Sequence, residues 1–239
     1  MSHVAIIDSV QTGLPKTVSF GNFTQSDPAE SKLWETGFVK QQITGPVWLS
    51  MTNLAGDGQA DLFHHGGSHK AVCVYPASHY PYWQTVLPLS ELPHGSFGEN
   101  FTVSNLVEAD VCIGDIWQIG DATVQVSQPR QPCWKLARRW NIKDLANQVQ
   151  QTGRTGWYFR VKVEGDVSAG MALTLLNRPH PRWTVAAANS IMHHDRKNYS
   201  AAFELAALSE LSPSWQETLH NRVHQNTEPD VSLRLDGQG

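Results

Sequence analysis

The chain has 239 residues, of which 40% are hydrophobic and 17% are charged, a composition that supports a sizeable core and excludes disorder over most of its length. A net charge of −4 argues against a general nucleic-acid binder, and no apolar run approaches the roughly 18 residues of a membrane span. We therefore expect a cytoplasmic protein without nucleic-acid or membrane partners. Its three cysteines, Cys73, Cys112 and Cys133, are an odd number without a CxxC pair, a pattern that fits neither a disulfide framework nor a zinc ribbon.

Short segments with alternating or β-branched residues, separated by turns rich in Gly, Pro and Asp, fill residues 1–180. The alternation of Trp157, Phe159 and Val161 with polar neighbours predicts a strand with one buried and one solvated face. Many short strands with such turns are typical of a mainly antiparallel sandwich or barrel, so we predict a mainly β fold. The expected strands are residues 4–7, 38–43, 47–51, 71–75, 100–103, 116–119, 123–127 and 157–163.

Helices are predicted inside this region and after it. Residues 76–87 favour one short helix, and residues 133–151 have apolar side chains three or four positions apart, with Asn141 dividing the stretch into two helices. Candidate caps at Thr184, Ser200 and Ser212, and the helix-initiating Pro213, predict three short helices within residues 181–225. Because such a segment is too small to be stable alone, it should dock on the β domain or on a second subunit. Residues 226–239 are expected to form a flexible tail.

The first candidate site is the run HHGGSHK at residues 64–70. The glycine pair Gly66 and Gly67 lets the backbone approach a ligand and adopt positive φ, so its N–H groups, together with His65 and Lys70, could bind a phosphate. The three imidazoles of the run also allow a metal site. A polar hairpin loop in front of a core strand explains the same residues without any ligand.

The second candidate is the run FGENFT, where Glu99, Asn100 and Thr102 offer a carboxylate, an amide and a hydroxyl that could orient a polar ligand. A turn that caps a strand accounts for these residues equally well and needs no ligand. Arg160 lies on the strand face opposite Trp157, and it is either a solvated side chain or a phosphate contact.

The third candidate is the run QPRQPCWKL at residues 128–136. Pro132 makes the approach rigid, and Cys133 then lies at or near a helix start, where free N–H groups and the helix dipole favour a thiolate. Arg130 and Lys135 add positive charge. This setting indicates a metal ligand or a nucleophile, whereas Cys73 and Cys112 lie in apolar runs and are interpreted as packing residues.

In this order, His65-Gly66-Gly67, the run Gly98–Thr102 and the run Arg130–Lys135 resemble the MOSC domain family, named from the C-terminal domain of molybdenum cofactor sulfurase. The run Gly156-Trp157-Tyr158 and the segment Arg178–Val185 with its three following helices look like the YiiM branch, the 6-N-hydroxylaminopurine resistance proteins. The resemblance covers residues 3–225.

This resemblance implies a MOSC-type β-barrel with a few interspersed helices in residues 1–180 and a small three-helix domain in residues 181–225. It implies the molybdenum cofactor, Mo-molybdopterin, with Cys133 as metal ligand, and it leaves pyridoxal phosphate binding open. It also implies reduction of N-hydroxylated bases such as 6-N-hydroxylaminopurine, with electrons from a separate reductase and Glu99 or His65 as proton donor. The candidate cofactor contacts are His65, Gly66, Gly67, Lys70, Asn100, Thr102, Arg130, Lys135 and Arg160.

Two other functions stay open. Cys133 could carry a persulfide or pass the cofactor to another enzyme, which would make the protein a non-enzymatic cofactor- or sulfur-handling module. A metallohydrolase built on His64, His65 and His69 is the third hypothesis. The three-helix segment could close the pocket of its own subunit, dock a partner or make a homodimer.

Overall fold

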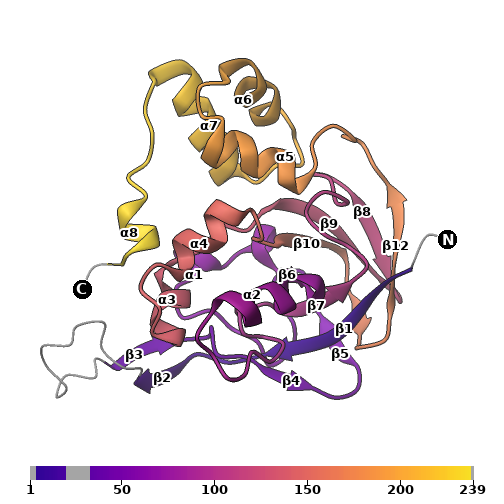
Figure 1. The fold of residues 1–239 in the computed structure, drawn as a ribbon. Helices are drawn as coiled ribbons and strands as arrows, with labels where there is room; N and C mark the ends of the chain where they lie inside the picture. Colours follow the sequence, from indigo (N-terminus) through magenta and orange to yellow (C-terminus); the bar gives the residue numbers. More distant parts are fainter. Residues whose placement is uncertain (1–3, 20–32, 238–239) are drawn as a thin grey trace, which may run out of the picture.

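A closed ring of seven strands forms the centre of the molecule (Figure 1). The computed structural model describes residues 4–19 and 33–237. The strands of the ring are β1 (Ala5–Thr12), β6 (Val72–Pro76), β7 (Phe101–Ser104), β8 (Ile116–Ile119), β9 (Ala122–Pro129), β10 (Trp157–Val163) and β12 (Ala172–Asn177). They follow one another in the order β12-β8-β9-β10-β6-β7-β1, and the ring closes because β1 also pairs with β12. Only β6 and β7 run parallel in this ring, so the predicted, mainly antiparallel barrel is confirmed.

Five short strands lie outside the ring, namely β2 (Lys16–Ser19), β3 (Leu33–Thr36), β4 (Gln41–Ile43), β5 (Val47–Leu49) and β11 (Gly165–Val167). β4 extends the sheet beside β1, β2 pairs with β3, and β5 pairs with β11. The sequence patterns miss β2, β3, β11 and the ring strand β12. In β12 only Leu173 is buried, so the strand shows no alternation and is formed by its pairing with the distant strands β1 and β8.

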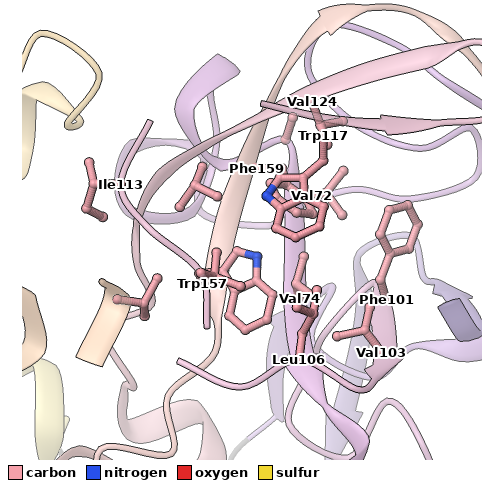
Figure 2. Packing of buried hydrophobic residues seen from close by; sticks show 14 of the residues in the cluster. Val72, Val74, Phe101, Val103, Leu106, Ile113, Trp117, Val124, Trp157 and Phe159 are labelled. Carbon is pink, nitrogen blue, oxygen red and sulfur yellow. The ribbon is translucent and has the colours of Figure 1, made fainter. Parts of the chain in front are cut away.

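The interior of the barrel is filled by large apolar side chains from most of its strands. Figure 2 shows Trp117, Trp157, Phe159 and Phe101 packed together there, each of them buried. A second cluster joins β6 to the helices outside the ring, and in it the ring of Tyr75 stacks on Phe97 with 4.4 Å between centroids. Burial of this aromatic surface is the main favourable term in the stability of the domain.

Helices lie at the predicted positions within residues 76–87 and 133–151, whereas the helix Leu62–His65 is not predicted from the sequence. Asn141, in the left-handed conformation with φ of 53°, ends one helix and separates it from the next. None of the helices in the described ranges is long and apolar enough to cross a membrane. The helices are α1 (Leu62–His65), α2 (Tyr80–Val86), α3 (Trp134–Trp140), α4 (Leu145–Thr152), α5 (Val185–Asn189), α6 (Tyr199–Ala206), α7 (Pro213–Gln225) and α8 (Ser232–Leu235).

The C-terminal helices α5, α6 and α7 dock on one end of the barrel (Figure 1). Leu205 and Trp215 are fully or almost fully buried, and they belong to the same apolar cluster as the barrel interior. The N–H of Ser212 donates to the carbonyl of Ser127 over 2.9 Å, and Arg160 donates to the carbonyl of Glu210. The helical region therefore shares its core with the barrel instead of forming one of its own.

Two details of this region differ from the sequence prediction. The cap of α6 is Asn198, whose side chain accepts from the N–H of Ala201 over 3.2 Å, instead of Ser200. Residues 226–237 are predicted as a flexible tail, but in the structure they include the short helix α8 and return to the barrel side of the molecule beside α3. Hydrogen bonds from Arg234 to Pro132 and Gln150 explain this placement.

Replacing Gly156 by alanine is expected to destabilise the protein more than the same change at Gly153. Both glycines have positive φ, 71° and 69°, which costs an alanine about 1–2 kcal/mol. A Cβ on Gly156 would also lie 2.1 Å from the carbonyl oxygen of Val74, whereas nothing lies within 4 Å of one on Gly153. We expect Gly156→Ala to lower the free energy of unfolding by about 1–3 kcal/mol more than Gly153→Ala in urea titrations. Equal losses would contradict this account.

Candidate functional site

Two connected cavities lie where the first and third sequence motifs meet, on the outer side of the barrel. An inner cavity of about 60 Å³ reaches in toward β6, and an outer cavity of about 650 Å³ lies between the barrel and the C-terminal region. Residues that line both cavities mark the junction between them. They are His65, Lys70, Gln131, Cys133 and Tyr158.

Cys133 is the N-cap residue of α3, as the sequence predicts, and only 7% of it is exposed. Its Sγ lies 3.5 Å from Nε2 of His65, and the other ring nitrogen of His65 lies 3.4 Å from Nζ of Lys135. Burial and the neighbouring ammonium groups of Lys135 and Lys70 hold the pKa of His65 at about 3. The imidazole beside the thiol is therefore neutral near pH 7.

Arg130 places a positively charged side chain in the inner cavity. The residue is 4% exposed, and its Nη1 has no hydrogen-bond partner among residues 4–19 and 33–237. Burial by itself would lower the pKa of Arg130, but the thiols of Cys73 and Cys133 and the hydroxyl of Tyr158 raise it above its ordinary value. A buried donor without a partner is costly, so this position favours an anionic or oxygen-bearing ligand.

Cys73 and Tyr158 belong to this site, although the sequence analysis assigns the first to packing and does not single out the second. Cys73 on β6 lies directly opposite Tyr158 on β10, so both side chains are on the same face of the sheet. Burial raises the pKa of the Cys73 thiol and of the Tyr158 hydroxyl above their ordinary values. The sequence signal that was missed is Tyr158, an aromatic side chain on the outward face of β10, which also carries Arg160 and Lys162.

Glu99 and Thr102 lie outside both of these cavities. The carboxylate of Glu99 is fully buried, where it accepts from the N–H groups of Gly95 over 2.7 Å and Phe97 over 3.1 Å. It also accepts from the hydroxyls of Tyr80 and Thr102. The structure thus places these two predicted site residues inside a turn that they hold together.

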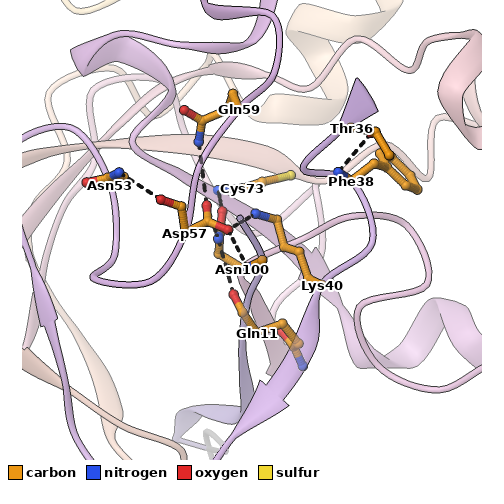
Figure 3. A network of polar contacts seen from close by, with 10 residues as sticks. Gln11, Thr36, Phe38, Lys40, Asn53, Asp57, Gln59, Cys73 and Asn100 are labelled. Atoms are coloured by element: carbon orange, nitrogen blue, oxygen red, sulfur yellow. Dashed lines mark hydrogen bonds and ion pairs between the residues drawn. The ribbon is translucent and has the colours of Figure 1, made fainter. Parts of the chain in front are cut away.

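Asn100 lines the inner cavity, but its amide is already bonded to protein groups (Figure 3). Its Oδ1 accepts from the N–H of Cys73 over 3.0 Å, and its Nδ2 donates to Asp57 over 2.9 Å and to the carbonyl of Gln11 over 3.2 Å. Asp57 forms a buried ion pair with Lys40, which also lines the cavity. This network fixes part of the wall of the inner cavity.

The Gly66-Gly67 loop follows α1, and neither of these predicted cofactor contacts lines either of the two cavities. Gly67 has φ of 92°, and no atom lies within 4 Å of the position of a Cβ, so its backbone faces open space. Gly66 caps α1, and a Cβ there would lie 2.8 Å from the carbonyl of Leu62. Lys70 lines both cavities, and its Nζ donates to the carbonyl of His64 over 2.6 Å.

Arg160 is placed differently from its predicted role. It lines neither of the two cavities, and its guanidinium donates to the carbonyl of Glu210 in the C-terminal region. Its position on the outward face of β10 agrees with the strand alternation. In the structure it connects the barrel to the helical region.

The cap of α1 is expected to be lost in acid. Partial burial acts to raise the pKa of Asp61, but hydrogen bonds from the backbone and ring of His64 outweigh it and lower the pKa to about 2. Because this pKa lies below the ordinary value of 3.8, the stabilisation is fully present above pH 3.8 and is lost as the pH falls through 2. An NMR titration of the His64 amide should show this transition. In Asp61→Asn, which retains a capping side chain, the transition should be absent.

Comparison with known proteins agrees with this arrangement of barrel, site and helices. Residues 61–174 match the model of the MOSC domain, and residues 183–226 match that of the YiiM-like, 3-alpha helix domain. The protein YflK of Bacillus subtilis, described as uncharacterized, is 47% identical over 210 residues, which cover 87% of this chain and 90% of YflK. The chain belongs to the YiiM family of MOSC-domain proteins.

Two further relatives extend the comparison. The crystal structure of YiiM from Geobacillus stearothermophilus superimposes with a TM-score of 0.75 at 36% identity, covering 92% of this chain and 99% of that one. A protein of Gibberella moniliformis named a reductase is 40% identical over 153 residues, which are 63% of this chain and 27% of that protein. Membership of the YiiM family confirms the predicted resemblance and the predicted fold, a MOSC-type β-barrel followed by a helical region.

Proposed function

We propose that this YiiM-family protein is a molybdenum-cofactor-dependent reductase of N-hydroxylated bases such as 6-N-hydroxylaminopurine, with Cys133 as metal ligand. One observation carries the proposal, namely that Cys133 and Arg130, whose buried Nη1 has no partner among the described residues, line the same inner cavity, which adjoins a larger one. The MOSC domain and the relative named a reductase support the oxidoreductase class.

The residues at the junction fit such a cofactor chemically. A soft metal suits the thiolate of Cys133, and an anionic group would pair with Nη1 of Arg130. Lys70 and Lys135 add positive charge within the same cavities, as a phosphate-bearing ligand requires. The outer cavity of about 650 Å³ lies within the roughly 300–1,000 Å³ that is typical of ligand sites.

In this proposal the protein holds the reactants and delivers a proton. When bound, the cofactor would supply the two electrons that break the N–O bond, which with two protons leaves an amine and water. Of the two proton donors considered from the sequence, His65 lines both cavities, whereas Glu99 lines neither. We therefore assign a relay to the neutral ring of His65, which would pass a proton from the ammonium of Lys135, 3.4 Å from one ring nitrogen, to the leaving oxygen. A separate reductase would supply the electrons.

The substrate would enter through the outer cavity. Its walls include the aromatic side chains of Phe63, 90% exposed on α1, and of Trp134 at the start of α3. An exposed aromatic ring at a cavity entrance can stack on a planar base. This arrangement favours a heterocyclic substrate over an aliphatic hydroxylamine.

The direct test is metal content together with activity. The protein would be purified from cells that make the cofactor, its molybdenum measured by elemental analysis, and the reduction of 6-N-hydroxylaminopurine followed with an artificial electron donor. We expect close to one molybdenum per chain and formation of the amine. Protein without molybdenum and without activity would overturn the proposal.

The second candidate function is a sulfur-handling module. The presence of two thiols, Cys73 and Cys133, in one cavity favours this alternative over a histidine-based metallohydrolase. Mass spectrometry separates the two candidate functions. A persulfide on Cys133 in protein without bound pterin would support the module, and an unmodified thiol with bound metal would support the reductase.

A further inference from the structure

The last described residues of the chain, 227–237, run along the outer cavity. Asn226 ends α7 in the left-handed conformation, with φ of 50°, and turns the chain back toward the barrel. The segment then passes beside the cavity and places α8 next to α3 and α4 (Figure 1). Pro229, Asp230, Val231, Leu233 and Arg234 all line the outer cavity.

This segment is attached mainly at its two ends. Near the first end, the carboxylate of Glu228 pairs with the buried Arg222 and, over 3.0 Å, with Arg196. Near the second end, Arg234 donates from Nη1 to the carbonyl of Pro132 and from Nη2 to Oε1 of Gln150 over 2.6 Å. The attachment at Arg234 therefore lies one peptide bond from Cys133.

Between its attachments the segment is exposed and weakly packed. Val231 is 37% exposed and Leu233 is 53% exposed, although both line the cavity. Few buried apolar contacts and mainly exposed backbone are properties of segments that open at low free-energy cost. A ligand in the outer cavity would cover these two side chains, and their burial would favour the closed position.

Arg234 differs from the two arginines that bind the first end of the segment. It donates to neutral oxygens of Pro132 and Gln150, whereas Arg222 and Arg196 each pair with the carboxylate of Glu228. Burial lowers the pKa of Arg234, and the neighbouring Cys133 thiol acts in the opposite direction. A cation held by neutral acceptors next to the site can release them more easily than a buried ion pair can separate.

We propose that residues 227–237 form a strap that opens and closes the outer cavity, and that Arg234 latches it beside Cys133. Arg234 is in this view a positioning residue, because it holds the backbone that carries the thiol. The significance of the strap rests on the proposed function of the site. The test of the strap uses only protein without cofactor. The strap proposal can therefore fail while metal binding succeeds, and metal binding can fail while the strap proposal succeeds.

The test is the rate at which Cys133 reacts with iodoacetamide in full-length protein without cofactor, followed by mass spectrometry of the peptides. We expect Arg234→Ala to increase this rate on the order of tenfold, because two hydrogen bonds of a charged group hold the latch. Arg234→Lys should give a smaller increase, since lysine keeps the charge but not the two-pronged geometry. The matched control is Arg182→Ala, an exposed arginine paired with Glu204 away from the cavities.

The other cysteines serve as internal controls in the same samples. Cys73 and Cys112 are buried, and their labelling should stay slow in every variant. An unchanged rate at Cys133 in Arg234→Ala would overturn the proposal. An increase shared equally by Cys73 and Cys112 would also overturn it, because Arg234 would then hold the whole fold instead of a local strap.

Discussion

Cys133→Ser is expected to reduce the bound molybdenum to background and to lower the rate of N-hydroxyl reduction by more than about 100-fold. Substituting a residue that only orients a metal ligand already lowers metal affinity or activity by about 10- to 100-fold, and Cys133 is the proposed ligand itself. A serine hydroxyl stays protonated near neutral pH and offers a hard oxygen where a soft metal prefers sulfur. Elemental analysis and the reductase assay on the same preparation measure both effects.

Cys112→Ser is the matched control for this substitution. Cys112 is also buried, but it lines neither of the two cavities, and its thiol contacts the carbonyl of Pro181. This variant should keep its molybdenum and its activity. If Cys133→Ser retained both as well, Cys133 would not be the metal ligand, and the assignment of the site would have to be abandoned.

Glu99→Ala is expected to lower the free energy of unfolding by about 3–5 kcal/mol, comparable to breaking a buried ion pair. The substitution leaves the N–H groups of Gly95 and Phe97 and the hydroxyl of Tyr80 without their buried acceptor. Each such loss costs about 1–3 kcal/mol before the turn relaxes. Urea denaturation followed by circular dichroism measures the change.

Glu99→Gln separates a structural role from a catalytic one. The amide keeps the size of the side chain and one acceptor oxygen, so folded protein should be recovered. If Glu99 only holds its turn, activity per bound molybdenum should stay within about threefold of wild type, far less than the 10²- to 10⁴-fold that a general acid contributes. A fall of that larger size would restore Glu99 as the proton donor and contradict the assignment of His65.

Local patterns predict much of this fold. The alternation in β10 describes a strand with one buried face, and the apolar run of β6 describes a strand that is buried on both faces. Gly-Asp turns bound β8 and β9, which are close in sequence and pair with each other. Asn141 divides its two helices because asparagine tolerates the left-handed conformation. By contrast, β12 has one buried side chain and depends on pairing with the distant β1 and β8, which no local pattern reveals.

The candidate site, like the fold, could be predicted from the sequence only in part. The sequence by itself determined that Cys133 begins a helix in a basic setting and that a glycine loop with His65 and Lys70 is available as a partner. Only the tertiary structure decided that the register of β6 and β10 brings Cys73 and Tyr158 into the cavity, while Glu99 and Arg160 lie outside it. The physical reason is that helix starts and turns follow from near neighbours along the chain, whereas the face on which a strand residue meets a cavity follows from pairing across the closed barrel.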